Sequence, residues 1–501
     1  MKLPSINFGW KPKEGLIYSP HNSVHRAIAG QKVYNITKVV QRSVKIIVSD
    51  NTFSGSFSVS NGICTIRIES DKEHRFITPV KNIKFDKDIT HSYRNGTNTY
   101  GSTFQYPITS IVYTAKVVDP NNMKDVTLEL NGYSNTEITK ILFKDGIIKS
   151  KEPNFIYNTK PNVQLVNFSR IEGMLLGIAI GDSLGDTSES MMPNERNQRH
   201  GLITDYLPNR HAHYKGIGLP SDDTQLSFDT LLVILNKGKL DLDELAKVFS
   251  SHRIFGVGKT VKEFLSNYKD HKEPWYLSGV VDGAGNGALM RIEPVIISYL
   301  ANPNENLWAD TILATMLTHN SSLAIGSSVA FINMLCEFLS SRTPPDKDKM
   351  INEFTDILGY FTADTECNIR NPKIRSKFSN SAHLFIKQAI EYGYKNNISV
   401  KEFSEYFGSG AYVLETDAIS LYIISKYLDD PKEAIIEAVN YSRDNDTTAS
   451  IVGAAMGALY GRDAFKDSWI SGLSGRIREY DDRKVFELIN RTKEFLDNKK
   501  Y

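Results

Sequence analysis

Residues 441–461 read YSRDNDTTASIVGAAMGALYG, a polar start followed by a run of Ala, Gly and small apolar residues. The polar start holds two carboxylates and two hydroxyls, at Asp444, Asp446, Thr447 and Thr448. Such side chains cap the first turn of a helix, because their oxygens accept hydrogen bonds from its free N–H groups and complement the helix dipole. Two carboxylates at i and i+2, followed by a hydroxyl, also form an oxygen-rich cluster suited to a hard cation. The stretch therefore predicts a helix that begins at either a cap or a metal site.

A second stretch, RIEGMLLGIAIGDSLG at 170–185, has Gly173, Gly177 and Gly181 at every fourth position. This spacing places them on one face of a predicted helix, where the missing side chains permit close approach of another backbone. The apolar run is too short to cross a bilayer. Through the rest of the chain, apolar residues recur at intervals of three and four, which predicts further helices. We therefore expect residues 166–501 to form one all-α domain.

The first third of the chain has a different pattern. Between Lys32 and Ile147, β-branched residues alternate with polar ones in short runs such as KVVQRSVKIIVSD, GSFSVSNGICTIRIES, TSIVYTAKVV and VTLELNGYS. Gly, Asn, Asp and Pro separate these runs, so the pattern predicts a small β-sheet or sandwich. Residues 149–165 are polar, contain two prolines and lack periodicity, which is typical of a linker. We predict a β-rich domain at 1–165 and a helical domain at 166–501.

The net charge of +1 is divided unevenly along the chain. Residues 1–165 hold 22 Lys and Arg against 13 Asp and Glu, and the remainder holds 37 against 45, so the two parts carry +9 and −8. The basic part could face an acidic partner or the acidic part, or the charges could simply be solvated. Three cysteines without paired spacing favour a reducing compartment. Because no apolar signal region opens the chain, we expect a cytoplasmic protein, with delivery by a specialised secretion system as the open alternative. We expect neither membrane nor nucleic acid as partner.

Three further segments concentrate polar residues where helices are predicted to begin or end: GDSLGDTSES at 181–190, PSDDTQ at 220–225 and GAGNGALMR at 283–291. Each has a structural interpretation, as a helix end, an N-cap and a tight turn. The glycine-rich loop would also suit a phosphate. PSDDTQ and the stretch at 444–447 share one design, a hydroxyl and carboxylates at a helix start. Together they would supply about six oxygen ligands, enough for two divalent cations with water completing the coordination.

Several segments follow one another in a recognisable order from about Arg170 to Gly461: RIEGMLLGIAIGDSLG, the glutamate four residues after Gly185, PSDDTQ, FGVGKT, GAGNGALMR, THN, FGSGAYVLE and DNDTTASIVGAAMGALYG. In these segments the chain resembles the ADP-ribosylglycohydrolases. The resemblance implies an all-α fold with a binuclear magnesium site. It does not cover the β-rich domain, for which no family is recognised.

The resemblance also implies roles for particular residues. Two Mg²⁺ ions, which Mn²⁺ can replace, would be held by Ser221, Asp222, Asp223, Asp444, Asp446 and Thr447. The catalytic carboxylates would be Glu189, as proton carrier or gate over the metals, and Asp223. The substrate would contact Gly283, Gly285, Asn286, Gly287, His319 and Tyr412. Asp182 would either bind metal or support the neighbouring turn, and we favour the supporting role.

The implied activity is Mg²⁺-dependent removal of ADP-ribose from an acceptor, above all protein arginine. Retention of all six predicted ligands argues against a silent binding or structural protein. A third hypothesis, compatible with the first, is an antagonist or immunity protein that binds or reverses an ADP-ribosyltransferase. Expected partners are then ADP-ribosylated protein, ADP-ribose and, through the β-rich domain, the transferase or its target. The chain departs from the family at Ser221 in place of Thr, at Arg443 beside the acidic cluster, and at Asn320-Ser321 after the pocket histidine.

Overall fold

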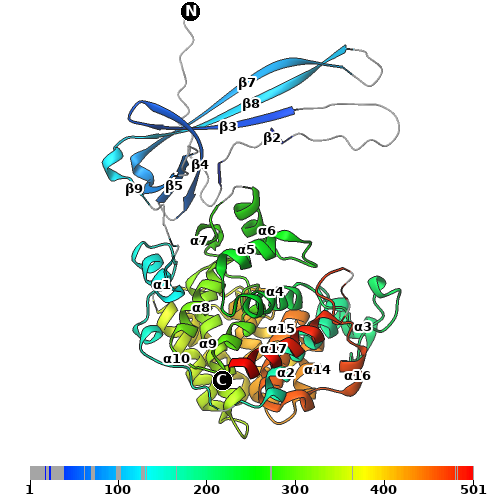
Figure 1. Ribbon diagram of the computed structural model, residues 1–501. Coiled ribbons are helices and arrows are strands. Elements are labelled where there is room, and N and C mark those ends of the chain that lie inside the picture. Colours follow the sequence, from blue (N-terminus) through cyan, green and yellow to red (C-terminus); the bar gives the residue numbers. More distant parts are fainter. Residues whose placement is uncertain are drawn as a thin grey trace, which may run out of the picture. The chain divides into compact units, whose positions relative to one another are not determined.

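The structure is a computed structural model that describes residues 17–18, 22–23, 39–60, 63–68, 74–97, 103–125, 130, 132–164, 166–270, 273–363, 365–479, 481 and 483–499. The chain divides into two compact units, Met1–Asn131 and Gly132–Tyr501. Figure 1 shows the first as strands and the second as helices. The predicted β-rich and all-α parts are thus confirmed, although the boundary between them lies earlier than residue 165.

In the β unit, the described strands pair into one sheet in the order β7-β8-β3-β4-β5-β6-β9, with β1 paired to β4 and β2 to β3. Strands β3 and β8 run parallel, and the other pairs are antiparallel. The strands are β1 (Ile17–Tyr18), β2 (Asn22–Ser23), β3 (Val39–Val48), β4 (Asn51–Ser60), β5 (Ile63–Ile68), β6 (His74–Pro79), β7 (Ile83–Thr97), β8 (Thr103–Val117) and β9 (Lys124–Asp125).

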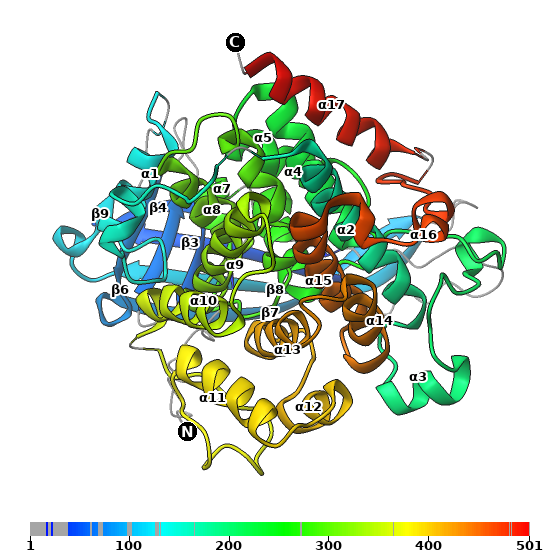
Figure 2. The same cartoon turned by 90° about the horizontal axis from the view of Figure 1, so that it is seen from below.

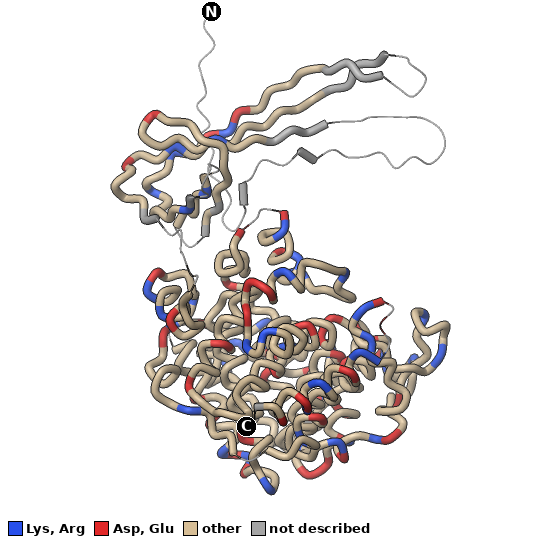
Figure 3. Tube along the Cα trace, viewed as in Figure 1, with Lys and Arg blue, Asp and Glu red and all other residues tan. Residues whose placement is uncertain are grey.

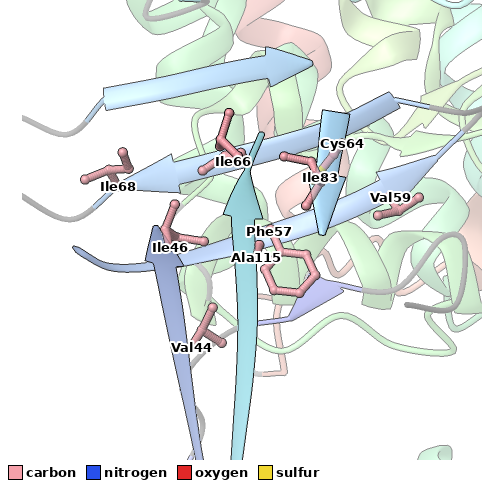
Figure 4. Packing of buried hydrophobic residues seen from close by; sticks show 10 residues of the cluster. Val44, Ile46, Phe57, Val59, Cys64, Ile66, Ile68, Ile83 and Ala115 are labelled. Atoms are coloured by element: carbon pink, nitrogen blue, oxygen red, sulfur yellow. The ribbon is translucent and has the colours of Figure 1, made fainter. Parts of the chain in front are cut away.

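Strand β4 links the two halves of this sheet. Its first residues pair with β3, and from Gly55 onward it pairs with β5. A β-carbon on Gly55 would overlap the carbonyl oxygen of Arg67, so the close approach requires glycine. Figure 4 shows the core that the strands enclose; it is made of Val44, Ile46, Phe57, Val59, Cys64, Ile66, Ile68, Ile83, Ala115 and Val117.

The helical unit consists mainly of α-helices, seen from below in Figure 2. They are α1 (Asn135–Lys144), α2 (Phe168–Gly185), α3 (Pro193–His200), α4 (Asp222–Lys237), α5 (Leu242–Ser251), α6 (Lys259–Leu265), α7 (Trp275–Ser278), α8 (Asn306–Met316), α9 (Ser322–Ser340), α10 (Lys347–Thr362), α11 (Ala382–Lys395), α12 (Val400–Phe407), α13 (Val413–Lys426), α14 (Pro431–Tyr441), α15 (Asn445–Tyr460), α16 (Asp467–Gly472) and α17 (Lys484–Lys499). Two short strands, β10 (Val280–Val281) and β11 (His319–Asn320), pair in parallel.

Helices α2 and α15 lie side by side at the centre of this unit (Figure 2). A β-carbon on Gly173 would overlap the carbonyl oxygen of Gly457, and one on Gly181 would overlap that of Ala449. The order of these contacts makes the two helices antiparallel. The close approach predicted from the glycine spacing is therefore present, and it brings the end of α2 to the beginning of α15.

The earlier domain boundary has a local cause. Helix α1 begins with a capping box: Ser134 Oγ accepts a hydrogen bond from the backbone N–H of Glu137 at 3.3 Å, and Glu137 Oε2 accepts one from the backbone N–H of Ser134 at 2.8 Å. Its Asn135 donates a hydrogen bond from Nδ2 to Asp310 Oδ1 of α8 at 2.6 Å. The predicted strand pattern up to Ile147 is thus wrong for this segment, and residues 126–129 and 131 of its last run lie outside the described residues.

The predicted linker also packs onto the helical unit. Trp308 of α8 donates from Nε1 to the carbonyl oxygen of Thr159 at 2.7 Å, and the ring of Phe155 lies 6.1 Å from that of Trp308. One described helix, α9, is long and apolar enough to cross a membrane, and 83% of its most apolar window is buried within the protein. In Figure 3, residues of both charges occur along the whole described trace of the helical unit.

Candidate active site

Helix α4 begins at a buried acidic turn that the end of α2 holds in place. Both oxygens of Asp182 accept hydrogen bonds from the backbone N–H of Ser221, at 3.1 and 2.9 Å, and Oδ1 accepts from the Ser221 hydroxyl at 2.7 Å. The Thr224 hydroxyl donates to Oδ2 at 2.5 Å. Asp182 therefore satisfies the free donors at the start of α4 and sets the positions of Asp222 and Asp223. These bonds support the turn, while oxygens of Asp182, Asp223 and Asp446 also lie within 4.8 Å of one another.

Helix α15 begins beside the same turn. A β-carbon on Gly185 would overlap the backbone of Asp446, so the two chains touch at this point. Asn445 donates from Nδ2 to the carbonyl oxygen of Gly185 at 3.2 Å and to the Ser188 hydroxyl at 3.0 Å. The backbone N–H of Asp444 donates to the carbonyl oxygen of Ser409 at 2.9 Å. These bonds hold the first turn of α15 against the end of α2.

The two helix starts bring their carboxylates into one cluster. Oxygens of Asp182, Asp223 and Asp446 lie within 4.8 Å of one another, as do oxygens of Glu189, Asp444 and Asp446. Asp446 belongs to both groups. The Thr447 hydroxyl on α15 donates to Asp223 Oδ2 on α4 at 3.4 Å. The predicted metal ligands from the two motifs are therefore brought together, and Asp222, 8% exposed, lies in the same turn as Asp223.

The residues of this cluster fit divalent cations. Oδ1 of Asp223 and Oδ1 of Asp446 are buried and have no hydrogen-bond partner among the described residues. Burial, followed by the charges of neighbouring carboxylates, raises the pKa of Asp222, Asp223 and Asp446 well above the usual range. Unpaired buried carboxylates that repel one another are costly, and cations with oxygen preference remove that cost. The cluster could hold metal.

Glu189 follows directly after the short helix η4 (Asp186–Ser188), at the outer side of the cluster. Burial and then the charges of Asp444, Asp186 and Asp182 raise its pKa to about 7. A carboxyl group with such a pKa can exchange a proton near neutral pH. Asp186 accepts a hydrogen bond on Oδ2 from Asn209 Nδ2 at 3.2 Å, which joins η4 to the loop that follows α3.

The glycine-rich loop at 283–287 is fastened to the start of α15, to the N-cap of α9 and to the segment before α13. Asn286 donates from its backbone to the carbonyl oxygen of Ala411 at 3.0 Å and from Nδ2 to Asp444 Oδ2 at 2.6 Å. Gly283 accepts on its carbonyl oxygen from the Ser321 hydroxyl at 2.8 Å. The loop therefore sits at a set distance from the carboxylates.

His319 and Tyr412 lie on either side of this loop. His319 is 1% exposed, and a β-carbon on Gly287 would come within 3.0 Å of its Cε1. Burial and the charge of Arg291 lower its pKa to about 3, so the imidazole is neutral. Tyr412 forms a bridge with Gly285, and both line a pocket of about 480 Å³. Of the predicted substrate residues, Gly285 and Tyr412 thus face a pocket, while His319 supports the loop from beneath.

Residues 164–495 match the family described as ADP-ribosylglycohydrolase. The chain belongs to this family. It is 25% identical over 326 residues to an ADP-ribosyl-[dinitrogen reductase] glycohydrolase of Rhodospirillum rubrum, covering 64% of this chain and 95% of that protein. It is 23% identical over 375 residues to the ADP-ribosylarginine hydrolase Tri1 of Serratia proteamaculans, covering 72% and 89%. A third relative, the ADP-ribosylhydrolase ARH3 of Danio rerio, is 27% identical over 353 residues, covering 64% and 90%.

Membership confirms the resemblance and the enzyme class inferred from the sequence motifs. The family match begins at residue 164, beyond the β unit. The fold and the family together make this ADP-ribosylglycohydrolase a two-unit hydrolase with an acidic cluster between the starts of α4 and α15.

Some residues that build the site were not predicted. Arg196, 0% exposed, donates from Nη1 to the carbonyl oxygens of Asn440 at 3.1 Å and Ser442 at 2.7 Å, which shapes the turn before α15. Of the departures from the family, Arg443 is exposed. Asn320 accepts on Oδ1 from the backbone N–H of Lys149 at 2.8 Å, so it fastens the predicted linker to the helical unit.

Proposed function

We propose that this protein is a Mg²⁺-dependent hydrolase that removes ADP-ribose from ADP-ribosylated arginine in proteins. The observation that carries the proposal is the meeting of two helix starts at one buried cluster of carboxylates beside a glycine-rich loop. Two Mg²⁺ ions would be held by Ser221, Asp222, Asp223, Asp444, Asp446 and Thr447. Mn²⁺, which accepts the same ligands, would substitute.

When bound, Mg²⁺ acts as a Lewis acid toward the ribose hydroxyls and toward the water that attacks the anomeric carbon. The loop at 283–287 binds the diphosphate, and Asn286 keeps that subsite at a fixed distance from Asp444. Tyr412 contacts the adenosine side, where it lines the pocket. As the bond from the anomeric carbon to the arginine nitrogen breaks, Glu189 takes a proton from the attacking water and passes it to the leaving nitrogen. Asp223 orients that water from the buried side. No covalent intermediate with the protein is required.

The acceptor assignment rests on charge and on one relative. Asp186 and Glu189 place two carboxylates at the outer side of the cluster, where they favour a cationic guanidinium. The Serratia relative is named an ADP-ribosylarginine hydrolase. The β unit, whose residues 1–131 hold 17 Lys and Arg against 10 Asp and Glu and therefore carry +7, would dock the modified protein or a transferase.

The test is incubation of the full-length protein with arginine-, serine- and carboxylate-linked ADP-ribose on peptides, and with ADP-ribosylated nucleic acid. Each substrate is offered with Mg²⁺, with Mn²⁺ and with EDTA, and released ADP-ribose is quantified. We expect release from arginine that EDTA abolishes and either metal restores. Release from serine alone would overturn the arginine assignment, and full activity in EDTA would overturn the metal assignment.

A further inference from the structure

Three arginines on segments far apart in the sequence act on the same neighbouring side chain, His211: Arg210, Arg253 and Arg476. The first follows Asn209, whose Nδ2 donates to Asp186 Oδ2 at 3.2 Å and to Thr187 Oγ1 at 3.0 Å. These bonds fasten the loop of Arg210 to η4, directly before Glu189. Arg210 is exposed.

Arg253 is held beside α4. Gln225 on that helix donates from Nε2 to the carbonyl oxygen of Arg253 at 2.8 Å and accepts on Oε1 from the backbone N–H of Phe255 at 2.9 Å. One residue further, a β-carbon on Gly256 would lie 3.0 Å from Asp222 Oδ1. The exposed Arg253 therefore lies three residues from a contact with a predicted metal ligand.

Arg476 completes the group from the segment after α16. Its guanidinium carbon lies 4.5 Å from the centre of the Phe255 ring. The three charges act on shared neighbours: those of Arg476 and Arg210 oppose the rise that burial causes in the pKa of Asp186. Burial lowers the pKa of His211, and Arg210, Arg476 and Arg253 lower it further. The arginines thus form one cationic rim.

The segment that carries Arg253 passes both the acidic cluster and the glycine-rich loop. Residues 253–260 run past the cluster, and a β-carbon on Gly283 would lie 3.0 Å from Thr260 Cγ2 at one end of this segment. Gly256 meets Asp222 in the middle, and Arg253 stands at the other end. Along this segment the contact with Asp222 therefore comes between Arg253 and the loop that would bind the diphosphate.

Two further basic side chains nearby contact a buried carboxylate. Arg478 donates from Nη2 to Asp229 Oδ1 at 2.5 Å, and His252 Nε2 lies 3.0 Å from Asp229 Oδ2, with Asp229 fully buried. They serve the packing of α4 and are not part of the rim. Glu479 and Asp481 line a pocket with Arg253, and Asp481 Oδ1 accepts the backbone N–H of Ile477 at 3.0 Å.

We propose that Arg210, Arg253 and Arg476 bind acidic side chains that flank the ADP-ribosylated residue of the protein substrate. The inference rests on the proposed function and adds a sequence preference to it. The modified arginine would lie at the carboxylates of the acidic cluster, and the residues next to it in the substrate sequence would be Asp or Glu. A short acidic segment fits better than nucleic acid. Residues 166–501 hold 37 Lys and Arg against 45 Asp and Glu, so a long polyanion would be repelled beyond the rim.

The test uses the full-length protein with Mg²⁺ and two fluorescent peptides that carry one ADP-ribosylarginine, flanked by Glu in one and by Gln in the other. We expect a KM about tenfold lower for the Glu peptide with a similar kcat, and loss of this preference when salt is raised about tenfold. Arg253→Glu should remove the preference and Arg253→Lys should retain most of it. Equal KM values for the two peptides, or an unchanged preference in Arg253→Glu, would overturn the inference.

The matched control is Lys432→Glu, an exposed charge reversal in the first turn of α14, where an acidic residue suits the helix dipole. This position is at the opposite end of a helix about 16 Å long from the turn that leads to Asp444. It should leave the preference intact. Fluorescence anisotropy with the unmodified peptides measures their binding to the rim in the absence of hydrolysis. If neither modified peptide is hydrolysed, the proposed function fails, while equal anisotropy titrations for Glu and Gln peptides overturn the rim by themselves.

Discussion

Gly177 of α2 and Gly453 of α15 meet backbone to backbone, and a β-carbon on either would overlap the carbonyl oxygen of the other. This contact lies midway along an antiparallel pair of helices. It sets their separation, and therefore how closely Gly185 approaches Asp446 at the end that carries the acidic cluster. The distance between carboxylates from two remote motifs thus depends on glycines two turns away.

Gly177→Ala should destabilise the helical unit. The added methyl group has no room, so the backbones must separate, and overpacking of this kind costs about 3 kcal/mol. The midpoint of thermal unfolding should fall, and hydrolysis should fall with it because the two helix starts move apart. Gly258→Ala is the control, since its β-carbon would meet nothing within 4 Å; a Gly177→Ala protein as stable as this control would contradict the packing argument.

The sequence predicted the acidic cluster because its ligands lie in two compact motifs, each at the start of a helix. The glycine spacing in α2 predicted a close partner. The domain boundary was misplaced because α1 is short and follows a strand-rich region, although Ser134 and Glu137 form a capping box that is readable in the sequence. The role of Arg196 had no such signal, because its bonds reach residues more than 240 positions away.

The acidic cluster should make the metal-free protein less stable as pH rises. Burial and like charges raise the pKa of Asp182 to about 6 and that of Asp446 well above its usual range. The folded state then binds more protons than the unfolded state. The free energy of unfolding that these carboxyl groups contribute is fully present below about pH 4, and it is lost as the pH rises through their folded-state pKa values. Mg²⁺ should reverse the loss at about pH 8, by about 2.7 kcal/mol at one hundred times its Kd. Calorimetry with and without Mg²⁺ measures both effects.

Asp446→Asn should stabilise the metal-free protein at about pH 8, because it removes one repelling charge. It should also abolish the gain in stability on adding Mg²⁺, here called the Mg²⁺ shift, because it removes a shared ligand. Asp417→Asn is the matched control. Asp417 is buried, accepts a hydrogen bond from the Ser327 hydroxyl at 2.5 Å and has a pKa raised by burial to about 7, but it belongs to neither carboxylate group. Asp417→Asn should change the pH dependence of the free energy of unfolding and keep the stabilisation by Mg²⁺. A full Mg²⁺ shift in Asp446→Asn would refute the binuclear site.

Glu189→Gln should separate catalysis from binding. If Glu189 carries the proton, kcat should fall by about 10² to 10⁴, while the Kd for ADP-ribose changes by less than about threefold. Single-turnover hydrolysis and calorimetric titration measure the two quantities. Asp186→Asn, one turn earlier, should reduce kcat much less. Affinity that falls in step with the rate would instead make Glu189 a wall of the pocket.

His319→Ala should show the opposite pattern. The imidazole is neutral and lies under Gly285 and Gly287, with Nδ1 2.8 Å from the Thr318 hydroxyl. Its loss would release the loop, so ADP-ribose binding should weaken by about tenfold with a smaller effect on kcat. Gly287→Ala tests the same support independently, because its β-carbon would press on His319 at 3.0 Å. Unchanged affinity in both variants would remove the loop from the binding site.

Removal of the β unit should affect large substrates more than small ones. A protein that begins at Gly132 keeps α1 and its bond from Asn135 to Asp310, so it should fold and hydrolyse a small ADP-ribosylarginine derivative at nearly the full-length rate. A protein that begins at Val166 lacks these contacts and should unfold at lower temperature. On an intact modified protein, the Gly132 form should have a lower kcat/KM, since residues 1–131, which carry +7, no longer contribute remote binding. Added salt should narrow this difference in kcat/KM, because the Debye length is about 8 Å at physiological ionic strength. Equal losses on small and large substrates would make the β unit a scaffold for the helical unit and not a docking module.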